Sequence, residues 1–419
     1  MSSLKLAAFS ELDALIARRH AVDDTTLASA ALIVADVRAH GDAALLRYAA
    51  EYDGLDREGP LVVLKEQLER ALDELDAEAR GVLERTAARI RRFAEAQRSA
   101  LRPLELAIEG GAAGHDIAPV ARAACYAPGG GYPLPSSVLM TAVTARVAGV
   151  GSVWVASPRP TKITLAAAAL AGADALLAAG GAHAIAALAY GTASIPRADV
   201  LVGPGNAWVT AAKKLVSGHV AIDMLAGPSE LVVLADEGAD PALIAADLLA
   251  QAEHALDALP ILVTTTRAHA EAVNEALAAQ LDELPTRAIA ARSLANGFAL
   301  VCTPEEGIVA CDRLAPEHLE VMTSDANERS KALSHYGALF IGHGSAEVLG
   351  DYGAGPNHVL PTGGTARHTG GLSVLTFLRV RTYLRIDEPE GRRALARDAA
   401  ALARLEGLEA HARAADRRA

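Results

Sequence analysis

The sequence predicts an α/β fold with two Rossmann-like parallel-sheet domains, an N-terminal helical segment and a C-terminal helical arm. The chain has 419 residues, more than a single hydrophobic core usually organises. Short apolar runs alternate with Ala-rich segments long enough to be crossover helices, first from residue 126 and again from residue 231. The segment 388–419 has a helical pattern but is highly charged, so it differs in character from the rest of the chain.

The composition limits the class of protein and its partners. Hydrophobic residues make up 51% of the chain and charged residues 21%, which is typical of a globular protein. A net charge of -12 argues against binding to nucleic acid or to an anionic membrane. Three cysteines (Cys125, Cys302 and Cys311) fit a reducing compartment better than a disulfide framework. The first residues lack the apolar core of a signal peptide, so we expect a cytoplasmic protein.

The N-terminal part is predicted to be mainly helical. Residues 1–20 are expected to form a helical tail. Residues 24–50 and 65–99 have the apolar spacing of helices, and the run Leu61–Leu64 between them is a predicted strand.

Two successive α/β alternations follow. In the first, Ser152–Ala156, Ala175–Ala178 and Val200–Val202 are predicted to be buried parallel strands. The second consists, in order, of Leu231–Leu234, the helix Pro241–His254, Ile261–Thr265, the helix His269–Leu284, Phe298–Val301 and Leu339–Ile341. We expect residues 21–124 and 231–372 to form one domain with the catalytic and metal residues. Residues 125–230 should form a cofactor-side domain and residues 373–419 the arm.

The end of the predicted helix Pro241–His254 carries a candidate for half of a metal site. Gln251 and His254 are three residues apart, so both side chains lie on one helical face and can reach a common point. Zinc usually takes four ligands, so this pair alone is a weak signal. From these residues alone, a capped, solvated helix end with a surface histidine is the favoured interpretation.

Two Gly-rich loops could meet phosphate groups at helix N-termini. They are Pro128–Gly131, followed by the hydroxyls of Ser136 and Ser137, and Gly203–Asn206, which comes directly after a predicted strand. Neither loop has the spacing of the dinucleotide-binding fingerprint, and each could be an ordinary tight turn. Because both lie on one side of a parallel sheet, a ligand at the carboxyl ends of its strands is favoured.

A set of motifs runs in order along nearly the whole chain. They are Tyr126-Ala-Pro-Gly-Gly, Gly203-Pro-Gly-Asn206, Ile222-Asp-Met with Ala226-Gly-Pro-Ser-Glu230, Gln251-Ala-Glu-His254, Ala315-Pro-Glu-His-Leu319, Gly350-Asp-Tyr with Asn357-His-Val-Leu-Pro361, and Glu406-Gly-x-x-x-His411. Each motif alone is weak, but together and in this order they resemble the histidinol dehydrogenase family.

The resemblance implies a zinc-containing, NAD-dependent enzyme of histidine biosynthesis. Members of the family bind one zinc ion through residues that match Gln251, His254, Asp351 and His411 here. The implied substrate-binding residues are Ser229, Gln251, His254, His318, Asp351, Glu406 and His411, with a lesser role for His358. The implied cofactor-binding residues are Tyr126, His183 and Asn206.

The resemblance also implies a mechanism and a partner. The family oxidises L-histidinol to L-histidinaldehyde and then to L-histidine, reducing two NAD. His318 would be the general base and Glu317 would activate water. On the residues alone, Glu317 and His318 could instead be the capped start of a helix after Pro316. The family is homodimeric, and its C-terminal segment crosses to the partner, so Glu406 and His411 would complete the neighbouring site.

Some positions depart from the family pattern, and two other functions stay open. His183 stands where glutamine is usual, Trp208 where tyrosine is common, Thr369-Gly370-Gly371 where a serine pair is frequent, and Cys125 where an aliphatic residue is usual. One alternative is a paralogue that oxidises another small polar alcohol with NAD, as sulfopropanediol dehydrogenases do. The other is a catalytically idle binding protein, against which the retention of Glu317, His318 and the zinc ligands counts.

Overall fold

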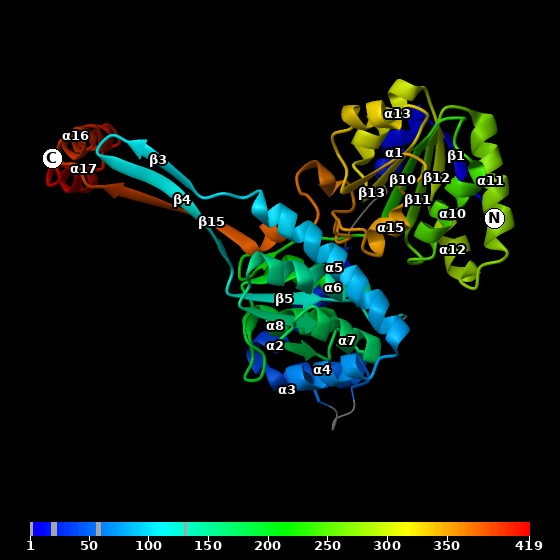
Figure 1. The fold of residues 1–419 in the computed structure, drawn as a ribbon, viewed down its shortest axis with the longest axis horizontal. Helices are drawn as coiled ribbons and strands as arrows, with labels where there is room; N and C mark the ends of the chain where they lie inside the picture. The colour runs from blue at the N-terminus through cyan, green and yellow to red at the C-terminus, as the bar shows by residue number, and fades with distance from the viewer. Residues whose placement is uncertain (1–2, 18–22, 56–59, 130–131) are drawn as a thin grey trace.

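The computed structural model describes residues 3–17, 23–55, 60–129 and 132–419. It consists of two α/β units and an arm that projects away from them (Figure 1). The predicted α/β fold class is therefore confirmed. Two glycines of the first predicted loop, Gly130 and Gly131, lie outside the described residues.

The first unit is built on a six-stranded sheet around β5. The strand order is β2 (Val62–Leu64), β7 (Ala175–Leu177), β6 (Ser152–Ala156), β5 (Arg122–Tyr126), β8 (Val200–Val202) and β9 (Ala221–Ile222). All neighbours are parallel except β2, which runs antiparallel to β7. One face packs on α4 (Lys65–Asp73), α5 (Ala77–Ser99), α6 (Pro135–Ala148) and α7 (Lys162–Leu170). The other packs on α2 (Asp24–His40), α3 (Asp42–Tyr52), α8 (Gly181–Tyr190) and α9 (Ala207–Val216).

The second unit has a fully parallel six-stranded sheet. Its order is β1 (Lys5–Ala8), β12 (Phe298–Val301), β11 (Leu259–Thr264), β10 (Glu230–Ala235), β13 (His318–Met322) and β14 (Ala338–Ile341). One face packs on α10 (Pro241–Ala252), α11 (Arg267–Leu281) and α12 (Arg287–Leu294). The other packs on α1 (Leu12–Ile16), α13 (Pro304–Leu314) and α14 (Ala326–Arg329). Short 3-10 turns cover Phe9–Glu11, Ser330–Ala332, Thr365–Arg367 and Val374–Phe377.

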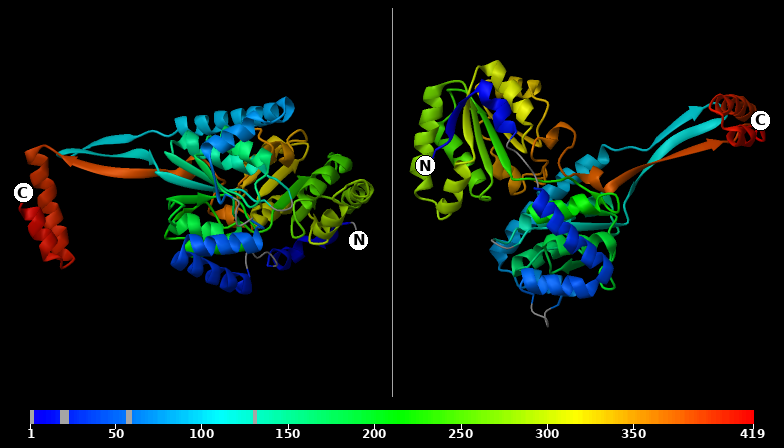
Figure 2. Two further views of the ribbon diagram at one scale, coloured as in Figure 1. Left: turned by 90° about the horizontal axis from the view of Figure 1, so that it is seen from below. Right: turned by 180° about the vertical axis from the view of Figure 1, so that it is seen from behind.

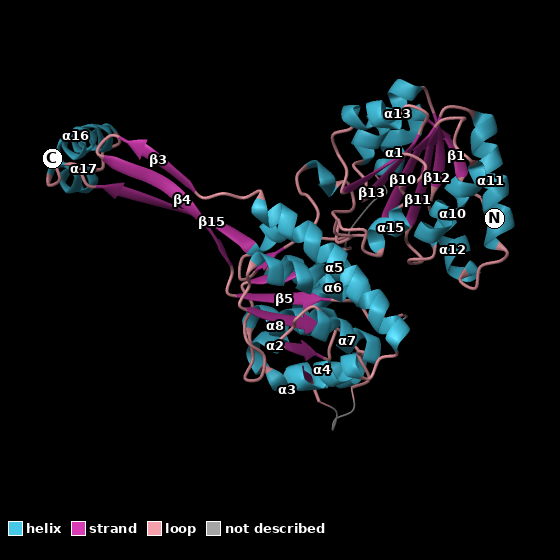
Figure 3. Cartoon of the chain, in the orientation of Figure 1, coloured by secondary structure: helices cyan, strands magenta, loops and turns pink. Residues whose placement is uncertain are grey.

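The arm combines segments from distant parts of the chain. Its antiparallel sheet has the order β15 (Leu378–Ile386), β4 (Gly111–Pro119) and β3 (Leu104–Ile108). The helices α16 (Pro389–Leu405) and α17 (Glu409–Asp416) pack on each other at its far end. Figure 2 shows from two further sides that this end lies apart from both α/β units, and Figure 3 shows that its strands form a long ribbon.

The observed domains differ from the predicted division. β1 lies within the predicted N-terminal helical tail but pairs with β12, so residues 5–8 are part of the second sheet. Residues 21–124 do not group with residues 231–372, because β2 pairs with β7 and α2 to α5 cover the first sheet. The arm includes β3 and β4 as well as the predicted residues 373–419, because β15 pairs with β4.

Both long predicted helices are interrupted. The helix expected over residues 24–50 is divided into α2 and α3 at Gly41, whose φ of 55° suits glycine and not a continuing helix. The helix expected over residues 65–99 is divided into α4 and α5, and Asp76 caps the second by accepting a hydrogen bond from Ala79 N at 2.8 Å. Among the described residues, every helix is too short or too polar to cross a lipid bilayer.

Candidate active site

The end of α10 brings the first two predicted metal ligands into place. Gln251 lies in its last turn and is fully buried, yet neither Oε1 nor Nε2 has a hydrogen-bond partner among the described residues. Since a buried amide without a partner is destabilising, this side chain indicates a missing ligand. His254 follows the helix, and its Nδ1 lies 3.0 Å from Ala250 O, which leaves Nε2 for a ligand.

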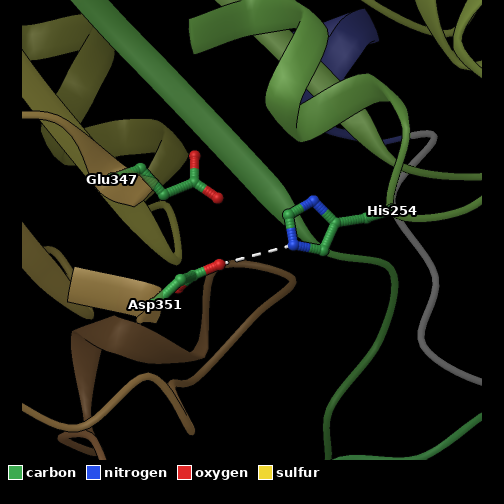
Figure 4. A group of neighbouring side chains, drawn as sticks. All are labelled: His254, Glu347 and Asp351. Carbon is green, nitrogen blue, oxygen red and sulfur yellow. Dashed lines mark ion pairs between the residues drawn. The ribbon is translucent and has the colours of Figure 1, made fainter. Parts of the chain in front are cut away.

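A potential metal centre forms between His254 and α15 (Glu347–Asp351). His254 Nε2 lies 3.4 Å from Asp351 Oδ2. Ligand atoms of His254, Glu347 and Asp351 lie within 4.8 Å of one another (Figure 4). Both side-chain oxygens of Glu347 are buried and have no hydrogen-bond partner within the described ranges. This mixed nitrogen and oxygen set fits zinc.

Glu347 was not among the predicted site residues. It lies four residues before Asp351, one turn away on the same short helix, so the spacing could have raised it as a candidate once Asp351 was chosen. Its buried position next to His318 and His254 is a property of the tertiary structure.

Glu317 and His318 stand at the start of β13. The alternative prediction of a helix start after Pro316 is therefore wrong, because His318 pairs with Leu231 of β10 and Ala338 of β14. Glu317 Oε2 accepts hydrogen bonds from Ser229 Oγ at 2.6 Å and Glu230 N at 2.9 Å.

His318 is surrounded by carboxylates. Its Nδ1 lies 3.2 Å from Glu230 O and 3.6 Å from Glu347 Oε1, and its Nε2 lies 3.5 Å from Asp351 Oδ1. Burial alone would lower the pKa of His318, but the charges of Glu347, Glu317 and Asp351 outweigh it and raise the pKa well above its usual value.

The same charges act on the other titratable groups. The side chain of His254 is 39% exposed, and its partial desolvation is outweighed by Asp351 and Glu347, so that its pKa rises to about 9. Burial raises the pKa of Glu317 despite the opposing effect of His318. For Asp351, hydrogen bonds with His254 and His318 outweigh burial and lower the pKa. The carboxylates therefore favour the protonated forms of His254 and His318.

A cavity of about 720 Å³ opens beside these groups and is lined by His318, Asp351 and His358. The orientation of the His358 ring is fixed by a hydrogen bond that its Nδ1 donates to Asp351 O at 2.8 Å. Its Nε2 lies 3.4 Å from Ser137 Oγ at the start of α6. Burial lowers the pKa of His358, so its ring is neutral near pH 7.

The first unit holds the loop that follows Asp351. Asn357 Nδ2 donates to Met140 O of α6 at 2.8 Å, and Arg89 Nε of α5 donates to Gly353 O at 2.7 Å. Since α6 starts at the carboxyl end of β5 and β13 begins at His318, the site lies between the carboxyl ends of the first sheet and the amino ends of the second.

The residues expected to bind the cofactor lie in the first unit, Tyr126 at the end of β5, His183 in α8 and Asn206 at the start of α9. Tyr126 and His183 are both buried beside the turn at Gly180 and Gly181, where Tyr126 Oη accepts from Gly181 N at 3.2 Å. His183 Nε2 lies 2.9 Å from Asp53 Oδ2, so its ring is already engaged within the protein. Asn206 is exposed, and its Oδ1 caps α9 by accepting from Trp208 N and Val209 N.

The two C-terminal candidates lie elsewhere. Glu406 directly follows α16 and His411 is part of α17, both exposed at the far end of the arm (Figure 1). Within one chain, the structure thus brings Gln251, His254 and Asp351 together with Glu317 and His318, but not with Glu406 or His411.

Comparisons with known proteins agree with the ordered motifs. A sequence model described as histidinol dehydrogenase matches residues 16–419. Histidinol dehydrogenase of Thermus thermophilus is 46% identical over 417 residues, covering 98% of this chain and 99% of the relative. That of Dechloromonas aromatica is 42% identical over 415 residues, covering 97% and 95%. A crystal structure of histidinol dehydrogenase from Elizabethkingia anophelis superimposes with a TM-score of 0.92 at 31% identity, covering 99% of this chain and 98% of that one. These relatives are oxidoreductases, and the chain belongs to the histidinol dehydrogenase family.

Proposed function

We propose that this protein oxidises L-histidinol to L-histidine through L-histidinaldehyde, with zinc bound and two NAD reduced in turn. The observation that carries the proposal is the buried Gln251 amide without a partner, in the last turn of the helix that leads to the cluster of His254, Glu347 and Asp351. The named relatives support histidinol as substrate. The three free, buried cysteines are consistent with work in the cytoplasm.

Gln251, His254 and Asp351 would hold zinc together with His411 of the partner subunit. Bound zinc would supply a positive charge that holds the imidazole and amino nitrogens of the substrate. The same charge would counteract the effect of the neighbouring carboxylates on the pKa of His318. Ser229 would contribute a further polar contact, since its hydroxyl already lies 2.6 Å from Glu317.

The proton transfers would be made by Glu317 and His318. His318 lines the cavity, so its imidazole can take the hydroxyl proton while hydride leaves to NAD. Glu317 would then take a proton from the water that hydrates the aldehyde, because burial raises its pKa and makes it a better base. After releasing the first proton to solvent, His318 would accept the proton of the second oxidation.

NAD would bind at the carboxyl ends of the first sheet, near Tyr126, His183 and Asn206. The contact between Ser137 and His358 supports this placement, since it brings that edge of the sheet next to the cavity. Because His183 faces Asp53, its role would be to hold the Gly180–Gly181 turn in place for the cofactor.

The arm would reach a second copy of the chain. Apolar side chains remain exposed along it, including Leu106, Val380 and Leu405, the last with 85% of its surface accessible. These side chains would be covered by the partner subunit in such a dimer. In a homodimer, Glu406 and His411 of the partner subunit would then enter the site.

The test is NADH formation by zinc-loaded protein with L-histidinol, alongside hydroxyalkyl sulfonates and other amino alcohols. We expect two NADH for each histidinol consumed. Turnover of a sulfonate alcohol without turnover of histidinol would instead identify the paralogue activity, and bound zinc without any oxidation would favour the idle binding protein.

A further inference from the structure

Beyond the residues proposed to touch the substrate or zinc, β13 and α10 place two further carboxyl groups behind the site. Side chains alternate along β13, so Glu320 shares the face of His318, while Leu319 and Val321 face the opposite core. On α10, Asp247 lies one turn before Gln251 on the same face. Glu320 is fully buried and Asp247 is 8% exposed.

Glu320 is bonded to the helix that carries Asp351. Its Oε1 accepts a hydrogen bond from Glu347 N at 2.6 Å, at the first residue of α15. The residue before α15 is Ala346, which offers no side-chain cap, so Glu320 takes the place of a capping residue.

The Glu320 carboxyl group also interacts with Asp247 of α10. Glu320 Oε2 and Asp247 Oδ2 are both buried without a donor among the residues that the structure describes. Burial and the neighbouring Asp247 raise the pKa of Glu320, which favours a proton shared between the two carboxyl groups.

We propose that Glu320 is a positioning residue that joins α15 to α10 and so fixes the spacing between Asp351 on one helix and Gln251 and His254 at the end of the other. It touches neither substrate nor cofactor. The inference rests on the proposed function, in that these ligands hold zinc. Partners behind metal ligands commonly set their orientation, and their loss weakens metal binding by about 10- to 100-fold.

The test compares Glu320→Gln with Glu320→Leu. Glutamine keeps an acceptor for Glu347 N and adds an NH₂ donor toward Asp247, whereas leucine fills the space and keeps neither. The dissociation constant for Zn²⁺ is measured on purified metal-free protein by competition with a chromophoric chelator. We expect E320L to bind zinc about 10-fold or more weakly and E320Q to bind it like the original protein.

His269→Leu provides a matched control. His269 is a buried polar residue of the same unit, bonded to Thr264 Oγ1 at 2.8 Å and Ala239 O at 3.0 Å, away from the zinc ligands. Equal zinc affinity in E320L and the original protein, equal loss in E320Q and E320L, or equal loss in H269L and E320L would each overturn the positioning role. If E320L does not fold, Asp247→Asn and Asp247→Leu make the same comparison.

The proposed function fails in a different way. If the original protein binds no zinc, or if His254→Asn leaves its zinc affinity unchanged, the metal site itself is misassigned. If His254→Asn weakens zinc binding but Glu320→Leu does not, only the positioning role of Glu320 is overturned.

Discussion

At the scale of single residues, the site is a dense group of buried charges whose protonation depends on one another. His318 has three carboxylates as neighbours, and Glu317 is held by Ser229 and by a backbone amide. The two residues therefore differ in environment although they are adjacent in sequence. This difference allows separate tests of their proposed roles.

Replacing Glu317 by glutamine should slow the conversion of aldehyde to acid more than the oxidation of the alcohol. Glutamine keeps an acceptor for Ser229 and Glu230 N but cannot take a proton from water, and general base catalysis contributes about 10²- to 10⁴-fold. Stopped-flow measurement of each half-reaction, started from histidinol or from histidinaldehyde, checks this. Equal losses in the two steps would contradict the water-activating role.

His254 should make the stability of the metal-free protein depend on pH. Its pKa is raised from 6.5 to about 9 in the folded protein, so the protonated imidazole stabilises the fold. This contribution is complete below pH 6.5 and is lost as the pH rises through 9. The difference in free energy of unfolding between the original protein and His254→Asn should thus be largest near pH 6 and shrink toward pH 9.5. Denaturant titrations in the presence of a chelator measure it, and a difference that grows with pH would contradict the assigned ion pair with Asp351.

Sequence patterns could identify some of these residues and not others. Gln251 and His254 could be paired from their spacing of three residues, because Gln251 lies in the last turn of α10 and His254 directly follows its C-cap, Glu253. The motifs pointed to Glu317, His318 and Asp351 without explaining their geometry. Glu347 and Glu320 were missed because their surroundings are formed by tertiary contacts among α15, β13 and α10, and local sequence patterns do not predict such contacts.

At the scale of elements, α15 is a short helix whose position is set by its neighbours. Gly350 lies directly before Asp351, and a Cβ there would come within 2.8 Å of the Phe340 ring of β14. The helix must therefore approach β14 closely.

Gly350→Ala should displace Asp351 and weaken zinc binding, with an overpacking cost of about 1–3 kcal/mol in stability. Gly344→Ala is the matched control, because a Cβ at Gly344 meets nothing within 4 Å. Zinc competition assays and thermal unfolding of both variants provide the comparison. If the two variants behave alike, close packing on Phe340 does not position Asp351.

The predicted elements show where local patterns suffice. Buried parallel strands such as β6 and β8 were found because both of their faces are covered and they appear as continuous apolar runs. β3 and β15 are largely exposed and lack that signal. β1 was missed because it is four residues long and its partner β12 lies far along the chain.

At the scale of the whole molecule, the arm separates two parts of the proposed zinc site. His411 is on α17 at the end of the arm, while Gln251 and His254 belong to the second unit. Subunits carrying His254→Asn and subunits carrying His411→Asn should both be inactive alone. When mixed and reassociated, they should regain activity, since one of the two sites in a heterodimer is intact.

Histidinol oxidation and zinc content of the separated heterodimer check this exchange, with each mutant homodimer as control. A demonstrated heterodimer without activity would show that each site is built within one chain.

In the proposed homodimer, the distance of His411 from Gln251 and His254 within one chain would also affect how the protein responds to dilution. A site completed by two chains obeys mass action, so zinc affinity and specific activity should fall together once the concentration drops below the dissociation constant of the dimer. Free zinc would in turn promote association, because the ion would bind the dimer more tightly than either chain alone. Zinc binding and dimer formation would then be thermodynamically linked. A higher zinc concentration would compensate for a low protein concentration, and a higher protein concentration would compensate for scarce zinc.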